Sequence, residues 1–182
     1  MLSPQYSAKD SMQQLLGLIH AAQSFDPLAW AAKLGPNSPA PDLVHRANVA
    51  SAHRAAVCIY LSRVASPRDH TAQLPIDLEH LVAEIIGNIS TIKTNDALFT
   101  ATTWPAFIAG AETGDQARQE WLTRHFQELW KVEPWGLIKG ALGVLGRIWE
   151  KRKKVHESAV ARDQDDDWVG DLRESGVDWL II

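Results

Sequence analysis

The chain contains very little cysteine: one residue, Cys58, among 182. A single thiol excludes an intramolecular disulfide and every structural zinc motif that is built on several cysteines. It also fits a reducing compartment. We therefore expect a fold held together by its apolar core, with no metal and no cofactor.

Long apolar runs are missing as well. No stretch approaches the ~20 apolar residues that a membrane-spanning helix needs. The first residues include Pro4, Lys9 and Asp10 but no apolar block, so no signal peptide is expected. The net charge of −4 provides no general attraction to nucleic acid. Apolar residues make up 46% and charged residues 22%, which indicates a soluble globular protein.

The common nucleotide and hydrolase signatures are also absent. There is no glycine-rich dinucleotide loop after a strand, no P-loop and no Gly-x-Ser-x-Gly motif. Gly136, Gly140, Gly143 and Gly146 recur too regularly to form a phosphate loop. Their spacing instead predicts a helix face that a neighbouring helix approaches closely. No strand pattern appears anywhere, so we expect an all-α fold in a single domain.

Tryptophan, by contrast, is abundant, and five of the eight residues fall in one stretch: Trp104, Trp121, Trp130, Trp135 and Trp149. A largely buried tryptophan removes on the order of 200 Å² from water, so this stretch is expected to anchor the core. Apolar residues recur at helical spacing over 121–130 and 137–149. We predict an antiparallel hairpin, with Pro134 in the first turn of its second helix. Trp104–Ala109 would pack on the hairpin as a third helix, with Trp104 buried against it.

The first half of the chain shows further helical patterns between polar breaks. We expect helices over 15–22, 28–34, 43–64 and 76–92, with loops at 35–41 and 66–75. Asp10 or Ser11 is a suitable N-cap for the first helix. Asp26, followed by Pro27, suits the second, and Asp42 suits the third.

Another helical pattern covers 97–109, and Pro105 lies inside it. Because proline has no N–H to donate, it should mark a kink or a fresh helix start, which Thr103 would cap. The helix over 43–64 is rich in small residues that allow close approach of a neighbour: Ala47, Ala50, Ser51, Ala55 and Ala56.

The composition changes sharply after Arg152. We divide the chain into a helical body (1–152), a charged linker (153–167) and an apolar tail (168–182). The tail ends in Trp179-Leu180-Ile181-Ile182 and is too apolar to stay solvated, so we expect it to dock on the body. The acidic run Asp163–Asp167 should remain a solvated linker.

Few residues suggest chemistry. Glu79, His80 and Glu84 could share a helix face as metal ligands, but a solvated face is the favoured interpretation. His53 and Cys58 are five residues apart, on different faces, so a packed histidine and an inert thiol are expected. No catalytic residue is predicted.

Three further features leave alternatives open. Glu112 has no evident catalytic partner and is expected to pair with Arg118 or Arg147. The run Lys151-Arg152-Lys153-Lys154 fits the C-terminal end of a helix, where cations are favoured, and equally a nuclear-localisation signal. The aromatic residues could line a ligand pocket, although tryptophan at helical spacing is more often part of a core.

Several blocks, taken in order, resemble the C-terminal part of the fungal-specific transcription factor domain found in zinc binuclear cluster regulators. The similarity extends from Phe25 to Ile182. The blocks are Ser24–Ala31, Ala50–Arg63, Thr103-Trp104-Pro105 through Gly110-Ala111-Glu112, Leu129-Trp130, Pro134-Trp135-Gly136, Val144-Leu145 through Ile148-Trp149, and Val177–Ile182.

The resemblance implies an all-helical regulatory region of a nuclear transcription factor. In that family such a region is associated with regulation, dimerisation or effector response. A separate six-cysteine cluster reads DNA, and Cys58 alone cannot supply it. The chain is then either a fragment or a stand-alone relative that is nuclear or cytoplasmic. If further N-terminal helices are needed to complete the fold, residues 15–19 would expose an apolar face or be covered by a second copy.

The resemblance implies a protein partner, a second copy or a small-molecule effector, with no direct contact to DNA and no membrane association. Two other function classes stay open. One is a small-molecule-binding protein or enzyme of secondary metabolism that reuses the helical fold. The other is a helical interaction module.

Overall fold

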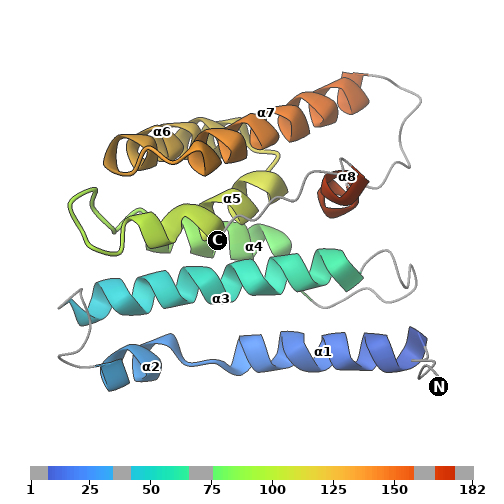
Figure 1. Cartoon of the computed structure of the whole chain (residues 1–182). Coiled ribbons are helices and arrows are strands. Elements are labelled where there is room, and N and C mark those ends of the chain that lie inside the picture. Colours follow the sequence, from blue (N-terminus) through green and yellow to red (C-terminus); the bar gives the residue numbers. More distant parts are fainter. Residues whose placement is uncertain (1–7, 35–41, 66–75, 158–166, 175–182) are drawn as a thin grey trace, which may run out of the picture.

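The computed structural model describes residues 8–34, 42–65, 76–157 and 167–174, and every regular element within them is a helix (Figure 1). This confirms the expected all-α fold. The elements are α1 (Ala8–Ser24), α2 (Pro27–Leu34), α3 (Leu43–Ala65), α4 (Leu78–Ile89), the 3₁₀ turn η3 (Thr100–Thr102), α5 (Thr103–Glu112), α6 (Gln116–Val132), α7 (Gly136–Glu157) and α8 (Trp168–Glu174).

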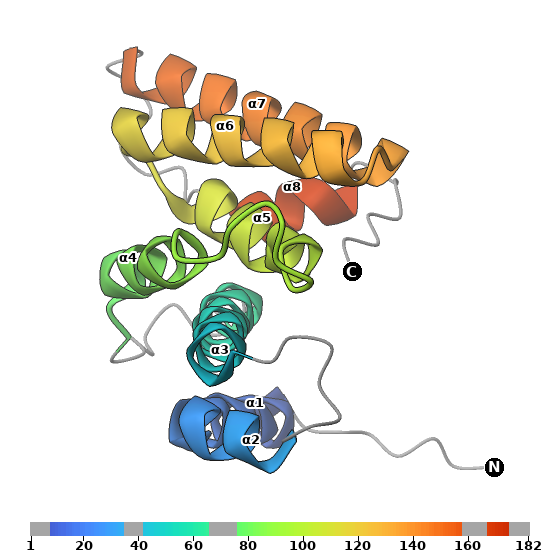
Figure 2. The ribbon, with the colours of Figure 1, turned by 90° about the vertical axis from the view of Figure 1, so that its left-hand side faces the viewer.

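Helix α3 lies in the middle of a stack of helices. It contacts α1 and α2 on one side and α4 and α5 on the other, and α6 and α7 lie beyond α5 (Figures 1 and 2). A helix with neighbours on both sides must be small and apolar around most of its circumference. The buried alanines of α3 meet this need: Ala47, Ala50, Ala52, Ala55 and Ala56. Four of the five small residues predicted to allow close approach are thus buried, and the fifth, Ser51, is half-buried.

Aspartate side chains cap the N-termini of several helices. Asp26 Oδ1 accepts hydrogen bonds from the backbone N–H groups of Leu28 and Ala29, both at 3.0 Å. Asp42 caps α3 in the same way, through Val44 and His45. The pKa of Asp42 is lowered by these bonds, and the hydrogen bond from the backbone N–H of His45 is the largest cause. Both predicted caps are thus confirmed.

The cap predicted for α1 is wrong. The helical backbone already begins at Ala8, so Asp10 and Ser11 lie within the first turn rather than before it. Three other aspartates, none of them predicted as a cap, begin later helices: Asp77 before α4, Asp115 before α6 and Asp167 before α8. Asp167, expected in a solvated linker, is therefore part of the docked α8 segment.

Helix α4 is shorter than the apolar pattern predicts, because it ends at Ile89 and not near residue 92. The hydroxyls of Ser90 and Thr91 donate to the carbonyl oxygens of Gly87 and Asn88, and such local bonds compete with the continuation of a helix. Ile92 is still buried, at 4% exposure, although it lies outside the helix. The apolar repeat therefore reports burial here and not helix length.

Pro105 is tolerated because a new helix starts just before it. The turn η3 precedes α5, and Pro105 is the third residue of α5, where a backbone N–H has no partner within the helix. The predicted restart is confirmed, but Thr103 is not its cap. It is the first helical residue, and its hydroxyl donates to the carbonyl of Thr100.

Helices α6 and α7 form the predicted hairpin, which α5 crosses (Figure 2). At the crossing Gly110 lies under Leu145, where an added Cβ would come within 2.8 Å of Cδ1. Trp149 Nε1 also donates to the Gly110 carbonyl at 2.8 Å. Gly110, on α5, is therefore a glycine that permits close packing.

Three details of the predicted hairpin are wrong. A Cβ on Gly136, Gly143 or Gly146 would meet nothing within 4 Å, so these glycines are not packing positions. Pro134 lies in the connection before α7, because Trp135 intervenes and α7 begins at Gly136. The exposed fraction of Trp135 is 59%, so this tryptophan does not anchor the core.

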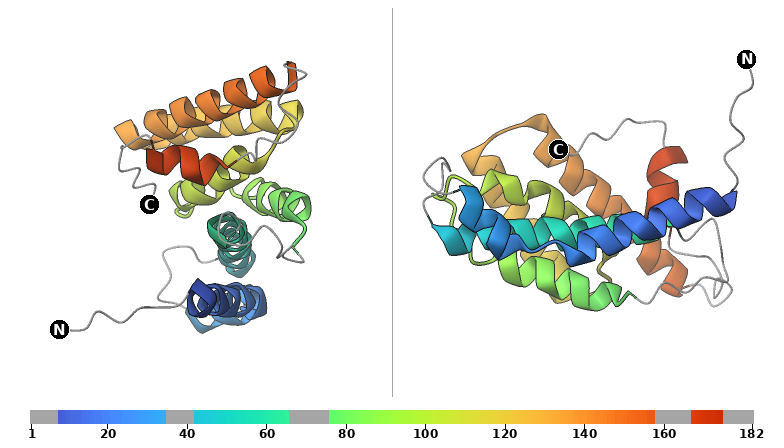
Figure 3. Two further views of the ribbon diagram at one scale, coloured as in Figure 1. Left: turned by 90° about the vertical axis from the view of Figure 1, so that its right-hand side faces the viewer. Right: turned by 90° about the horizontal axis from the view of Figure 1, so that it is seen from below.

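Helix α8 lies beneath α7 and beside α5 (Figure 3). Trp168 is only 1% exposed and meets the Phe107 ring edge-on, with 6.3 Å between centroids. Lys151 Nζ and an Asp171 oxygen are 2.6 Å apart, which ties α7 to α8. Docking of the tail is thus confirmed over 168–174. Its apolar end, 177–182, and residues 163–166 of the acidic run lie outside the described residues.

Candidate ligand-binding pocket

A cavity of about 700 Å³ lies between the α1–α2 pair, α3 and the segment that leads into α5. This volume is within the range of small-molecule sites, which are mostly apolar with a few polar groups. The lining is of this kind. It consists of Ala21, Ala22, Phe25, Trp30, Leu34, Arg46, Val49, Ala50, His53, Arg54, Val57, Leu98 and Ala101.

The aromatic wall follows from the bend between α1 and α2. The Asp26 cap and Pro27 start α2 immediately after α1 ends, which brings Phe25 and Trp30 together with 6.2 Å between ring centroids. Both rings are partly exposed, at 38% and 41%. Large aromatic rings that keep this much exposure beside a cavity provide contact area for a ligand.

Three polar side chains interrupt the apolar lining, and all come from α3. Arg46 is only 6% exposed. Arg54 Nη2 donates to Glu84 Oε1 of α4 at 2.6 Å. His53 Nε2 is 2.9 Å from the Ala101 carbonyl, which can only accept, so this nitrogen carries the proton. Burial lowers the pKa of His53, and the bond to Ala101 opposes the shift.

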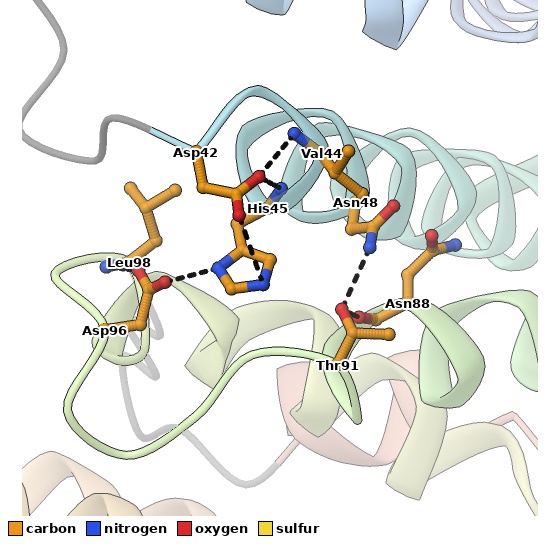
Figure 4. Close-up of polar contacts among 8 residues, drawn as sticks. All are labelled: Asp42, Val44, His45, Asn48, Asn88, Thr91, Asp96 and Leu98. Carbon is orange, nitrogen blue, oxygen red and sulfur yellow. Dashed lines mark hydrogen bonds and ion pairs between the residues drawn. The ribbon is translucent and has the colours of Figure 1, made fainter.

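The opposite wall is held by a polar junction between α3 and the segment after α4 (Figure 4). His45 Nδ1 is 2.6 Å from Asp96 Oδ2, and its Nε2 lies 3.9 Å from an Asp42 oxygen. One helical turn further, Asn48 Nδ2 donates to Thr91 Oγ1 at 2.9 Å. These bonds fix both ends of the 91–96 turn against α3.

The same junction positions the pocket wall. Asp96 Oδ1 accepts a 2.8 Å hydrogen bond from the backbone N–H of Leu98, a lining residue. His53 then holds Ala101, the next lining residue along the chain. The His53 ring also stacks on Trp104 of α5, with 5.7 Å between the ring centroids. The pocket is therefore linked through His53 to the helix that crosses the hairpin.

The expected burial of Trp104 against the hairpin needs correction for this reason. The ring contact of Trp104 is with His53 of α3, and the side chain is half-buried. In the hairpin itself Trp121 stacks on His125, with 5.1 Å between centroids. Lys139 Nζ lies 3.9 Å above the Trp130 ring. The rings of this stretch thus make separate ring contacts, while Trp104, Trp121, Trp130 and Trp149 all pack, partly buried, against the same hydrophobic core, as expected.

Glu112 pairs with an arginine, as expected, but with neither of the two that the sequence suggested. Arg63 of α3 donates to both carboxylate oxygens, with its Nε at 2.9 Å from Oε2. Trp168 Nε1 donates to the same Oε2 at 3.1 Å. Arg118 instead pairs with Glu79 at 2.6 Å. Glu112 therefore joins α3, α5 and α8.

The face of α4 that carries Glu79, His80 and Glu84 makes ion pairs with neighbouring helices. Glu79 pairs with Arg118 of α6 and Glu84 with Arg54 of α3. Among the described residues, no group of three His, Cys, Asp or Glu is placed to hold a metal ion. Cys58 is buried, and burial is the main cause that raises the pKa of its thiol, as expected for an inert cysteine.

Residues of the basic run serve contacts within the chain. Lys151 pairs with Asp171, and Arg152 donates to the carbonyls of Ala111 and Thr113 at the end of α5. Arg152 thereby satisfies carbonyls that a helix C-terminus leaves without partners. Lys153 and Lys154 are exposed. The run lies inside α7, which continues to Glu157.

No helix in the described ranges is both long and apolar enough to cross a membrane. The pocket was not predicted from the sequence, because its lining comes from four separate segments. One signal was available: the Phe25–Trp30 block carries two large aromatic residues around a helix break.

Comparison with known proteins decides the family. The model of the fungal-specific transcription factor domain matches residues 5–181. The chain belongs to this family. This family is a domain of fungal transcription factors, so the chain is a region of the kind found in such regulators. No solved structure matches it.

The chain is similar to the acriflavine sensitivity control protein acr-2 of Neurospora crassa. The two are 32% identical over 173 residues, which cover 91% of this chain and 28% of that protein. The chain thus spans somewhat more than a quarter of the length of this relative.

Proposed function

We propose that this chain is the effector-response region of a fungal transcription regulator and that the pocket between α2 and α3 is the effector site. The observation that supports the proposal is the pocket itself: about 700 Å³, mostly apolar, with three polar side chains from one helix. A ligand there would contact Leu98 and Ala101, which the polar junction and His53 connect to the rest of the domain.

The proposal favours binding over catalysis. Among the residues that the structure describes, the lining includes no serine, cysteine or carboxylate that could act as nucleophile or acid, and two of its three polar side chains are arginines. The alternative of an enzyme of secondary metabolism would need such a group beside the ligand. We place DNA recognition outside this chain, since one cysteine cannot build a six-cysteine cluster. A nuclear location follows from the regulatory role.

The experiment is a reporter assay in a fungal host. The chain is fused to an unrelated DNA-binding domain, and reporter output is measured across a panel of apolar small molecules. We expect at least one compound to change the output. Ala22→Trp should abolish the response, because Ala22 lines the pocket and is half-buried. Ala117→Trp, at an exposed site on α6, is the matched control. A response unaffected by Ala22→Trp would remove the pocket from the proposal.

A second candidate function is dimerisation, for which exposed leucines on the outer helices provide the observation. Leu15 and Ile19 of α1 are buried, but Leu16 is 42% exposed, and Leu18 and Leu28 are each 56% exposed. Native mass spectrometry tests this role. A dimer that Leu18→Glu converts to monomer would support it, and a wild-type monomer at all concentrations would contradict it.

A further inference from the structure

His53 lies between the pocket and α5. Its side chain is part of the described lining and comes from the middle of α3. Its Nε2 donates to the Ala101 carbonyl at 2.9 Å. Its ring stacks on Trp104, with 5.7 Å between the centroids and 22° between the ring planes. Trp104 is not among the described lining residues. His53 therefore borders the cavity and also contacts a helix that lies behind the described wall.

Helix α5 is placed to carry a change in this contact further into the domain. It packs on α3, α4, α6 and α7. Near its C-terminal end, the Gly110 carbonyl accepts a hydrogen bond from Trp149 of α7, and Glu112 pairs with Arg63 of α3. Packed interiors have few voids, so the displacement of one side chain is passed to its neighbours. A displacement of Trp104, at the start of α5, would therefore reach the hairpin.

We propose that the stack of His53 on Trp104 transmits occupancy of the pocket to α5. The inference deepens the proposed function and rests on this pocket being the effector site. A ligand that fills the cavity packs against the His53 side chain, so the His53 ring takes a different position relative to Trp104 in the filled and the empty pocket. A ligand shifts an equilibrium only through contacts that differ between the two states, and the stack supplies one. His53 is thus a positioning residue, needed for the response more than for binding.

A second route out of the pocket provides the matched control. The neighbouring lining residue, Arg54, donates from Nη2 to Glu84 Oε1 of α4 at 2.6 Å. Arginine and glutamate side chains have more rotatable bonds than histidine and tryptophan, so this ion pair follows a displacement without moving its helices. Glu84→Gln weakens the Arg54 contact and leaves the His53 stack in place.

The test uses the full chain labelled with 5-fluorotryptophan and followed by fluorine NMR. The probe is octan-1-ol, an aliphatic alcohol that has no ring current of its own. Trp30 lines the pocket and reports binding, whereas Trp104 reports transmission. Trp30→Phe and Trp104→Phe assign the two resonances. We expect both resonances of the wild-type chain to shift during the titration, with the same midpoint.

Variants separate transmission from binding. His53→Leu should reduce the Trp104 shift at least fourfold, because leucine has no ring face to stack, and the affinity measured at Trp30 should stay within about threefold. His53→Phe retains a ring and should keep at least half of the shift. Glu84→Gln should respond as the wild type does. If His53→Leu does not fold, as judged by circular dichroism, Trp104→Leu decides: it should keep the Trp30 titration and lose the reporter response at least fourfold.

Two results would overturn the inference. One is a Trp104 resonance that stays unmoved in the wild-type chain or still shifts fully in His53→Leu. The other is a Trp30 resonance that octan-1-ol leaves unmoved, because the inference requires an apolar molecule to enter the pocket. The reporter assay keeps the two proposals apart. A compound that acts through Ala22 equally well on the wild type and on His53→Leu would contradict this inference and leave the effector role standing. A Trp104 shift that His53→Leu removes, without a reporter response to any compound, would contradict the effector role alone.

Discussion

At the scale of single residues, Glu112 is a carboxylate that joins three helices. Its side chain is 7% exposed and that of its partner Arg63 is 17% exposed. The Trp168 indole donates to it as well. Three helices thus meet at one carboxylate, and each would lose a contact if its charge were removed.

We expect Glu112→Gln to lower the free energy of unfolding by about 3 kcal/mol, because it removes the charge that a largely buried carboxylate presents to the Arg63 guanidinium. The measurement is urea denaturation followed by tryptophan fluorescence. Glu128→Gln is the control, since Glu128 and Lys131 form a pair on α6 with side chains 43% and 67% exposed. An exposed pair should contribute less than about 1 kcal/mol. Equal losses in the two variants would show that burial of the Glu112 pair has no consequence.

His125 is the second residue with a predictable effect. It lies under the stacked Trp121 ring, and its Nε2 is 2.8 Å from Thr102 Oγ1. The Thr102 hydroxyl already donates to the Phe99 carbonyl, so His125 is the donor in this bond. Burial lowers the pKa of His125 from the ordinary 6.5 to about 4.

This shift predicts a loss of stability in acid. The folded state keeps His125 neutral, whereas the unfolded chain takes up a proton below pH 6.5. The unfolded state therefore binds more protons, and stability falls as the pH decreases from about 6.5 to about 4. The full shift corresponds to about 3 kcal/mol. His125→Gln should flatten the pH profile of chemical denaturation in this window. An unchanged slope would mean that the histidine ionises equally in both states.

At the scale of elements, the crossing helices α5 and α7 differ in how much space surrounds their glycines. Helix α5 is buried over most of its length, and its Gly110 meets Leu145 of α7. Helix α7 has one face against the core and another that is open at Gly143. The same substitution should therefore have opposite effects on the two helices.

We expect Gly110→Ala to destabilise the fold by about 1–2 kcal/mol, because the new methyl group would overlap the buried Leu145 side chain. Gly143→Ala should stabilise it by up to about 1 kcal/mol, since alanine favours a helix and meets no neighbour. Thermal melting followed by circular dichroism measures both. The crossing geometry is wrong if Gly110→Ala melts higher than the parent.

At the scale of the whole molecule, the ionisable side chains are used to join helices to one another. Arg54–Glu84 joins α3 to α4, Arg118–Glu79 joins α6 to α4, and Lys151–Asp171 joins α7 to α8. Glu79 and Glu84, which the sequence offered as a less favoured alternative for metal binding, both take part in these pairs. The positive charge near the end of α7 is partly committed in the same way.

We therefore expect the tag-free chain to contain no stoichiometric zinc and to show no specific affinity for DNA. Its single cysteine is buried with a raised thiol pKa, and its net charge is −4. Elemental analysis by mass spectrometry and a DNA-binding titration at physiological salt measure these two properties. One zinc ion per chain, retained after dialysis against a chelator, would contradict the prediction.

Several features of this protein were determined by the sequence alone, and they are the local ones. Helix type follows from apolar spacing, and the breaks follow from Asp26-Pro27 and Asp42, because a cap needs only the residues two and three positions ahead. The hairpin of α6 and α7 was also predictable, because it depends on residues close together in the sequence. A short connection leaves two amphipathic helices few other ways to bury their apolar faces.

The tertiary structure alone decided which distant residues meet. Arg63 is 49 positions from Glu112, and no local rule distinguishes it from Arg118 or Arg147. Gly110 became the close-packing glycine because of the place where α7 crosses α5, a long-range result that glycine spacing along α7 does not contain. The pocket depends on the same kind of information. Its described lining comes from four segments of the chain, which meet only once α3 packs against the α1–α2 bend.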